Sequence, residues 1–267
     1  MKVVYTNDTI NATAIGQIIN TNNKNQFVNR KTTLLVPYSN AKICFVKTID
    51  RTKESSIEKE LQPTLRVVRF LNNNKQYQPL FVKINAVVQL NNNDHYLMDV
   101  IRLGDLKVVL PLLKKKWKYS LLIQALFGLY ILNHKIKMYH NDLFFSDVVR
   151  NMMVDSVDGK TSVKLAIDNV ELTLKVEKFC VKVIDFGRCS SKPAFRVSEY
   201  HKKYFPDMKY VSEMFLFTFM YFKTINEHER IDFNALQLDL CNQSSCMLDF
   251  DNRFLLNMCE RFSKYLN

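Results

Sequence analysis

The chain has 267 residues, of which 47% are hydrophobic and 24% charged, so it can bury a core of ordinary size and is not a disordered protein. Its 38 Lys and Arg outnumber its 26 Asp and Glu, which gives a formal net charge of +12. No stretch reaches membrane-spanning length without charges, and no apolar signal core is recognisable. The six Cys form no C-x-x-C pair, which is typical of reduced thiols. We therefore expect an intracellular protein, not a secreted one.

The N-terminal region is poor in glycine. Residues 14–36 contain one glycine, Gly16, and an Asn-rich run at 20–25. Because Asn tolerates positive φ, this run can form a tight turn whose backbone N–H groups reach an anion. The alternative is a polar surface turn without a ligand.

A strand and a helix are predicted next. The alternating segment 41–49 predicts a strand that carries Lys47, and the apolar spacing from Ser55 to Leu71 predicts a helix. Glu58 and Glu60 point to different faces of that helix because they are two positions apart. Glu60 lies on the border of the apolar stripe.

The middle of the chain indicates a strand and then a turn. Segment 96–101 has the composition of a strand, and segment 102–106 that of a turn followed by a helix start. By residue type alone, Met98 is a core side chain and Asp105 a helix cap.

The apolar segment 119–132 predicts a largely buried helix, which begins after a basic run at 114–118. It leads into the tetrapeptide His140-Asn141-Asp142-Leu143. In a loop, His and Asp can cap backbone groups or act as acid and base on a substrate.

Residues 151–179 indicate an inserted β-element. Segment 155–160 has hairpin-turn chemistry, and strands are predicted at 163–167 and 170–176.

A last strand, 181–184, ends at Asp185-Phe186-Gly187. A carboxylate at a strand end beside a turn is well placed to hold Mg²⁺, and an ordinary Asp-x-Gly turn is the alternative. Further on, segment 208–222 predicts an apolar helix that Asp207 would cap.

In this order, the tetrapeptide at 140–143 and the triplet at 185–187 resemble the catalytic and metal-binding motifs of eukaryotic-like protein kinases. Because of the insert at 151–179, the chain resembles a divergent group that includes haspin-like kinases and kinases of large DNA viruses more than it resembles the regulated kinases of signalling pathways. The resemblance implies a single α+β domain of bilobal, protein-kinase-like fold. Its β-rich N-lobe would span about residues 1–101 and its mainly helical C-lobe about 102–267.

The resemblance also implies roles for the acidic residues. Asp142 would position and deprotonate a substrate hydroxyl, with His140 in the same loop, and Asp185 would hold Mg²⁺ or Mn²⁺. Two residues compete as second metal ligand. Asp147 has the family spacing and is preferred, while Asn151 has the family residue type.

The nucleotide contacts implied by the family lie upstream. Lys47 would bind the phosphates of ATP, with Glu60 preferred over Glu58 as its partner, and Gly16 would belong to the loop that covers the nucleotide. Adenine and ribose would be held by Met98, by the backbone of Asp99 and Val100, and by Asp105. Asp207 would brace the catalytic loop.

These features predict a serine/threonine protein kinase that uses Mg-ATP. Asn141 stands where many kinases carry Arg, which indicates a kinase not controlled by phosphorylation of its activation segment. The alternatives are a pseudokinase scaffold, favoured by the glycine-poor loop and Asp147, and a small-molecule phosphotransferase. The expected partner is a protein substrate, and the excess of positive charge suggests one that is acidic or bound to nucleic acid. No dedicated nucleic-acid-binding module is recognisable. If the chain is viral, the expected location is the cytoplasm or nucleus of the host cell.

Overall fold

The computed structural model describes residues 2–6, 33–39, 42–50, 57–90, 92–145 and 147–265. They form a mixed α+β protein with small antiparallel sheets. The chain divides into two units, one of Met1–Val68 with Val82–Val100 and one of Arg69–Phe81 with Ile101–Asn267. The main division therefore falls between Val100 and Ile101, next to the lobe boundary expected from the sequence. The short segment Arg69–Phe81 groups with the second unit, which the sequence did not indicate.

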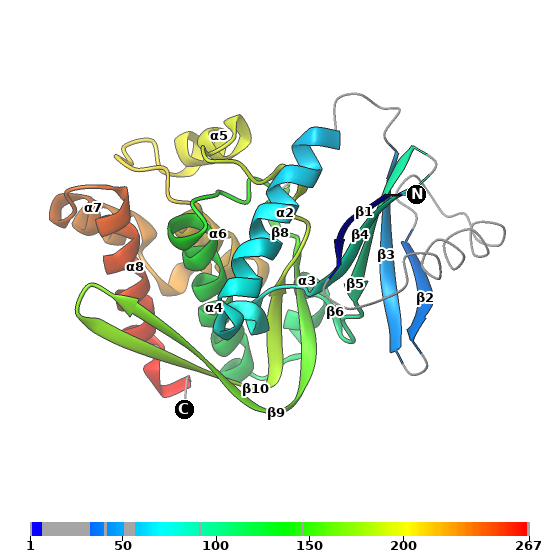
Figure 1. Cartoon of the computed structure of the whole chain (residues 1–267). Helices are drawn as coiled ribbons and strands as arrows, with labels where there is room; N and C mark the ends of the chain where they lie inside the picture. Colours follow the sequence, from blue (N-terminus) through cyan, green and yellow to red (C-terminus); the bar gives the residue numbers. More distant parts are fainter. Residues whose placement is uncertain are drawn as a thin grey trace. The chain divides into compact units, whose positions relative to one another are not determined.

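The first unit is built around a five-stranded antiparallel sheet with the strand order β1-β4-β5-β3-β2 (Figure 1). Its strands are β1 (Lys2–Thr6), β2 (Thr33–Ser39), β3 (Lys42–Asp50), β4 (Ile84–Leu90) and β5 (Asn93–Asp99). The strands predicted at 41–49 and 96–101 are confirmed as β3 and β5, and Lys47 pairs with Tyr96 across them. Helix α2 (Ile57–Asn73) confirms the predicted helix, and it contains Pro63.

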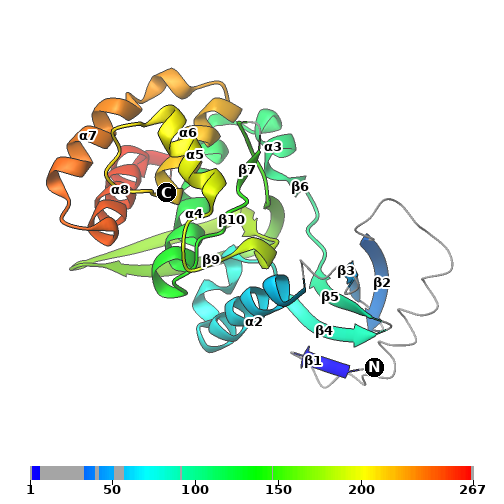
Figure 2. The same ribbon diagram turned by 90° about the horizontal axis from the view of Figure 1, so that it is seen from above.

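The second unit is mainly helical. Its helices and helical turns are η1 (Lys75–Leu80), α3 (Leu106–Val109), η2 (Leu110–Leu112), α4 (Lys115–Tyr130), η3 (Ile131–Lys135), η4 (Phe186–Arg188), α5 (Phe195–Tyr204), α6 (Glu213–Thr224), η5 (His228–Arg230), α7 (Phe233–Gln243), α8 (Met247–Arg261) and η6 (Ser263–Tyr265). Its strands are β6 (Gly104–Asp105), β7 (Phe144–Phe145), β8 (Val148–Val149), β9 (Met152–Ile167) and β10 (Val170–Val183). Figure 2 shows α5, α6, α7 and α8 gathered in this unit together with α4.

Helix α4 forms the centre of the second unit, as its composition predicts. Every side chain from Tyr119 to Tyr130 is buried, so the helix has no polar face. Gly128 allows a close approach to β10, because a Cβ at this position would stand 2.9 Å from Cγ2 of Val183. The helix thereby packs directly against the strand that leads to Asp185.

The inserted β-element is one long hairpin, β9–β10, that runs past α4 toward α8 (Figure 1). The predicted turn at 155–160 is wrong. Gly159 lies inside β9 with φ +111°, at a register shift, so Asp158 and Gly159 form a bulge there. The chain reverses between Ile167 and Val170 instead, where Asn252 of α8 donates to the carboxylate of Asp168 at 3.0 Å. The bulge lets the strands continue over the helical core.

Candidate functional site

The loop at 140–142 is held from inside the second unit by Glu213, the first residue of α6. The N–H of His140 donates to Oε2 of Glu213 at 2.8 Å, and the N–H of Asn141 donates to Oε1 at 2.7 Å. The amide of Asn133 donates to the same carboxylate at 3.2 Å. Burial raises the pKa of Glu213, while His140 and these donors act in the opposite direction. The loop backbone is therefore fixed by a buried, multiply bonded carboxylate.

The prediction that Asp207 braces this loop is wrong. Asp207 is exposed and precedes the helix, which begins after Ser212 and not at Met208. The hydroxyl of Ser212 caps α6 by accepting from the N–H of Phe215 at 3.1 Å. A Ser-Glu pair at the start of an apolar run is the capping signal that could have identified Glu213 from the sequence.

The two motifs adjoin each other. Nε2 of His140 lies 2.7 Å from the backbone oxygen of Ile184, the residue before Asp185. Asp185 has φ 59° and ψ 66°, a left-handed conformation that turns the chain out of β10. Burial raises the pKa of the Cys189 thiol, and the carboxylates of Glu213, Asp185 and Asp142 raise it further. All three carboxylates thus act on one buried neighbour.

Asn151 connects the same two motifs. Its Nδ2 donates to the backbone oxygen of Asp142 at 2.7 Å and to Oδ2 of that residue at 3.1 Å. Its own backbone oxygen accepts from the N–H of Ile184 at 3.1 Å. Since the amide nitrogen is used by Asp142, the amide oxygen is the atom of Asn151 that can bind a metal.

Asp147 is engaged elsewhere, so the preference for it over Asn151 is not supported by the geometry. Its Oδ2 accepts from the hydroxyl of Tyr204 at 2.5 Å and from Nζ of Lys223 at 3.1 Å, on helices α5 and α6. Desolvation raises the pKa of Asp147, but the bonds to Tyr204 and Lys223 outweigh it and lower the pKa overall. The preference for Asp147 depended on residue spacing alone. In the structure its side chain bonds the loop to helices α5 and α6.

Three arginines surround the Asp142 carboxylate, which is 4% exposed. Arg150 reaches Oδ2 at 3.0 Å, and Arg188 and Arg196 reach Oδ1 at 3.4 and 3.8 Å. They come from three segments: the residue after β8, the end of η4 and the first turn of α5. Nothing in the sequence pattern indicated this cluster, because the three residues are far apart along the chain.

Asn141 connects the segment after Gly187 to the loop at 140–142. Its Oδ1 accepts from the N–H of Ala194 at 2.6 Å, and its Nδ2 donates to Oγ of Ser190 at 2.8 Å. The same amide donates to the backbone oxygen of Lys192 at 3.2 Å. Hydrogen bonds of the Asn141 side-chain amide therefore hold this segment. In many kinases, an arginine at this position and a phosphate on the segment do so.

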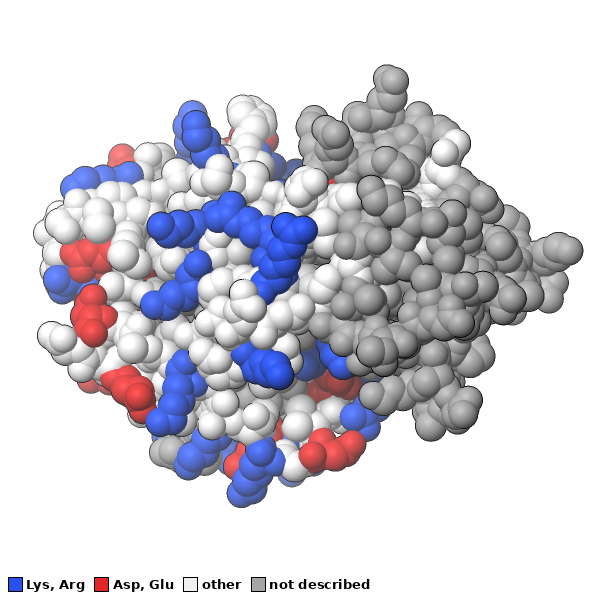
Figure 3. Space-filling model, in the orientation of Figure 1, with Lys and Arg blue, Asp and Glu red and all other residues white. Residues whose placement is uncertain are grey.

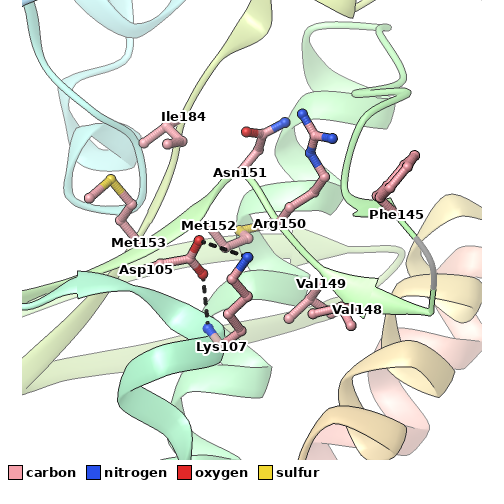
Figure 4. Close-up of a pocket in the computed structure, with 10 residues that line it drawn as sticks. All are labelled: Asp105, Lys107, Phe145, Val148, Val149, Arg150, Asn151, Met152, Met153 and Ile184. Carbon is pink, nitrogen blue, oxygen red and sulfur yellow. Dashed lines mark hydrogen bonds and ion pairs between the residues drawn. The ribbon is translucent and has the colours of Figure 1, made fainter. Parts of the chain in front are cut away.

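A hollow of about 340 Å³ lies beside these residues (Figure 4). Asp105, Lys107, Met153 and Ile184 line part of it, and Figure 4 shows Arg150 and Asn151 next to each other in its wall. The carboxylate of Asp105 caps α3 by accepting from the N–H of Lys107 at 3.0 Å. Asp105 therefore acts as the predicted helix cap and also borders a space large enough for part of a small ligand.

The oxygen atoms of Asp185 and Asn151 are of the kind that binds a hard cation, which would take its remaining ligands from a substrate. Mg²⁺ takes oxygen ligands and is usually bound by one or two carboxylates together with substrate phosphates. Asp185 and the amide oxygen of Asn151 supply such oxygens. Among the described residues, no three His, Cys, Asp or Glu side chains gather closely enough to hold a metal by themselves. A cation held by these two residues would therefore need further oxygen ligands, such as those of a phosphate.

The first unit contains the predicted cation and acid pair. Nζ of Lys47 on β3 lies 3.5 Å from Oε2 of Glu60 on α2, and both side chains are largely buried. This favours Glu60 over Glu58.

Of the other predicted nucleotide contacts of the first unit, Met98 and Asp99 end its last strand, β5, and Val100 follows them. Met98 is half-buried, and Asp99 is exposed, with its carboxylate accepting from Asn85 at 2.8 Å. Val100 is the last residue of the unit. Gly16 lies outside the described residues. The roles of these four residues remain predictions.

We compared the sequence with models of known protein families and with curated proteins, and neither comparison produced a match. In the described ranges, no helix combines the length and the apolar character that crossing a lipid bilayer demands.

Proposed function

We propose that the chain is a protein kinase of bilobal fold that transfers the γ-phosphate of Mg-ATP to a Ser or Thr hydroxyl of a protein. The observation that carries this proposal is the adjacency of the two motifs. His140 bonds to Ile184, and Asn151 bonds both to Asp142 and to Ile184. A hydroxyl-activating carboxylate and a metal-binding carboxylate are the pair that phosphoryl transfer requires.

Each residue of this group has a distinct task in the proposal. Asp142 orients the acceptor hydroxyl and takes its proton, while Asn151 and Arg150 hold the carboxylate through Oδ2. Asp185 and the amide oxygen of Asn151 hold the metal, which when bound neutralises charge on the phosphates. Lys47, paired with Glu60, binds the phosphates. Catalysis then comes chiefly from positioning.

The test is transfer of labelled phosphate from Mg-ATP or Mn-ATP to a panel of acidic and basic proteins. Asp142→Asn should lower the transfer rate by about 10²–10⁴-fold, because the hydroxyl loses its proton acceptor. Asp185→Asn and Lys47→Met should each remove most activity while the circular dichroism spectrum stays unchanged. Transfer at the wild-type rate by all three variants would refute the assignment.

One observation favours a pseudokinase as the second candidate. The carboxylate of Asp142 is contacted by three guanidinium groups, so a substrate hydroxyl must compete for it. A pseudokinase would transfer no phosphate to any protein, to choline or to an aminoglycoside. A thermal shift with Mg-ATP but no transfer would select the scaffold, and transfer only to a small molecule would select the phosphotransferase.

A further inference from the structure

The Asp142 carboxylate is bound unequally on its two oxygens. Oδ2 is held by Arg150 at 3.0 Å and by Asn151 at 3.1 Å. Oδ1 faces Arg188 at 3.4 Å and Arg196 at 3.8 Å, which are longer than a strong charge-assisted hydrogen bond. The first oxygen is therefore anchored, and the second is only loosely covered.

The two loosely bound arginines are also the accessible ones. The side chain of Arg188 is 58% exposed and that of Arg196 is 38% exposed, against 4% for Asp142. Within the described part of the chain, Asp142 is the ion-pair partner of both, as it is of Arg150. Three guanidinium groups thus contact the single carboxylate of Asp142. Each guanidinium has five N–H donors, so contacts with one carboxylate can use only some of them.

An aromatic ring adjoins one of these arginines. The guanidinium of Arg196 lies over the ring of Phe145, 5.3 Å from its centre, which fixes the direction of the side chain. Phe145 is itself half-exposed and, with Arg150, lines the hollow. Figure 3 shows Lys and Arg side chains widespread over the described part of one face, where Asp and Glu side chains are fewer.

We propose that Arg188 and Arg196 bind anionic side chains next to the acceptor hydroxyl, so that the substrate of this site is an acidic or already phosphorylated protein segment. This inference rests on the proposed function. Binding of the substrate anion draws the two arginines away from Oδ1, and this oxygen then accepts the hydroxyl. The same step selects the substrate and frees the proton acceptor. A substrate without an anion leaves Oδ1 covered.

The geometry fits a peptide better than a nucleic acid. A strand of DNA or RNA needs a basic track that follows its backbone over several phosphates. Here the three guanidinium groups converge on one carboxylate, so they match one or two anions at a fixed distance from one hydroxyl. Carboxylate and phosphate share this chemistry, and guanidinium binds both in a bidentate manner.

The test measures binding and transfer separately, using Ser peptides that differ only in their flanking residues: Glu, phosphoserine, Ala or Lys. Fluorescence anisotropy without nucleotide should rank the Glu and phosphoserine peptides above the Ala and Lys peptides. The double variant Arg188→Ala, Arg196→Ala should weaken binding of the acidic peptides by at least about tenfold. Binding of the Ala peptide should not weaken, because this peptide has no anion for the two arginines to bind. The comparison of Glu and phosphoserine peptides identifies the preferred anion.

The control is Lys160→Ala, Lys164→Ala, which removes two positive charges from exposed sites on β9. If general charge attraction governs binding, the control weakens it as much as the arginine variant and the inference fails. Equal affinity of wild type and arginine variant for the acidic peptides also overturns it, as does tighter, arginine-dependent binding of a short oligothymidylate. If the wild type transfers phosphate to none of the peptides but still binds the acidic peptides through the two arginines, the proposed kinase function is refuted. The proposed anion-binding role of Arg188 and Arg196 then stands.

Discussion

The two units hold their key charges in different ways. In the second unit, the Asp142 carboxylate is almost completely buried, and its loop is fixed by three donors to Glu213. In the first unit, Lys47 and Glu60 are 3.5 Å apart with side chains 15% and 19% exposed. Removing one partner of a buried, multiply bonded network is costly because the other groups stay buried and unsatisfied. A partly hydrated ion pair tolerates more change.

Glu213→Ala should cause the largest loss of stability, since it leaves three buried donors without an acceptor. We expect the free energy of unfolding to fall by about 3 kcal/mol, measured by urea denaturation. Asp207→Ala removes an exposed carboxylate of the same chain segment and should change it by less than about 0.5 kcal/mol. If Asp207→Ala lowers the free energy of unfolding more than Glu213→Ala does, then Asp207 is the residue that supports the loop.

His201 supports the same helix start and should make stability depend on pH. Its Nε2 donates to the backbone oxygen of Ser212 at 2.9 Å, and burial lowers the pKa of His201 to about 4. The unfolded chain, with a pKa near 6.5, therefore takes up the proton first as pH falls. This contribution is complete above pH 6.5 and is lost as pH falls toward 4, by about 3 kcal/mol over the whole window.

The measurement is the free energy of unfolding of wild type and His201→Gln between these pH values. Glutamine can still donate to Ser212 and does not titrate, so the variant should show the flatter curve. His228→Gln, at an exposed position, should retain the wild-type slope. Parallel curves for wild type and His201→Gln would contradict the prediction.

Asn151 and Asp147 offer a direct comparison within one loop. Asn151→Ala should lower phosphate transfer about tenfold or more, because it removes both the support of Asp142 and the proposed metal ligand. Asp147→Ala should keep the transfer rate and lose only about 1 kcal/mol of stability with its bonds to Tyr204 and Lys223. Steady-state transfer rates at several Mg²⁺ concentrations show which of the two variants has lost a metal ligand. A stronger Mg²⁺ dependence in the Asp147 variant would reverse the assignment.

The smallest effect is expected in the first unit. Glu60→Gln removes the charge that faces Lys47 and should lower transfer by about fivefold, the value of a partly exposed ion pair of about 1 kcal/mol. Glu58→Gln, two positions away on α2, is the matched control and should have no effect. If only the Glu58 variant loses activity, Glu58 is the functional partner.

Local patterns determined much of this protein. The alternation in β3 and the apolar run in α4 were sufficient to place these elements, since strand and helix periodicity are short-range properties. The loop position of Asp142 and the strand-end position of Asp185 followed from the same patterns. The start of α6 was misplaced, because an apolar composition marks a helix without marking its first residue.

The contacts between residues that are distant in the sequence were decided by the tertiary structure alone. The bond of Glu213 to the loop at His140 joins residues 73 positions apart, and the contact of Arg188 with Asp142 joins residues 46 apart. Asn151 replaced Asp147 beside Asp142 because the loop turns through left-handed conformations at both residues, which sequence spacing does not specify. Residue type and periodicity fix which groups a segment offers. Only the packing of the helices and strands fixes which of those groups meet.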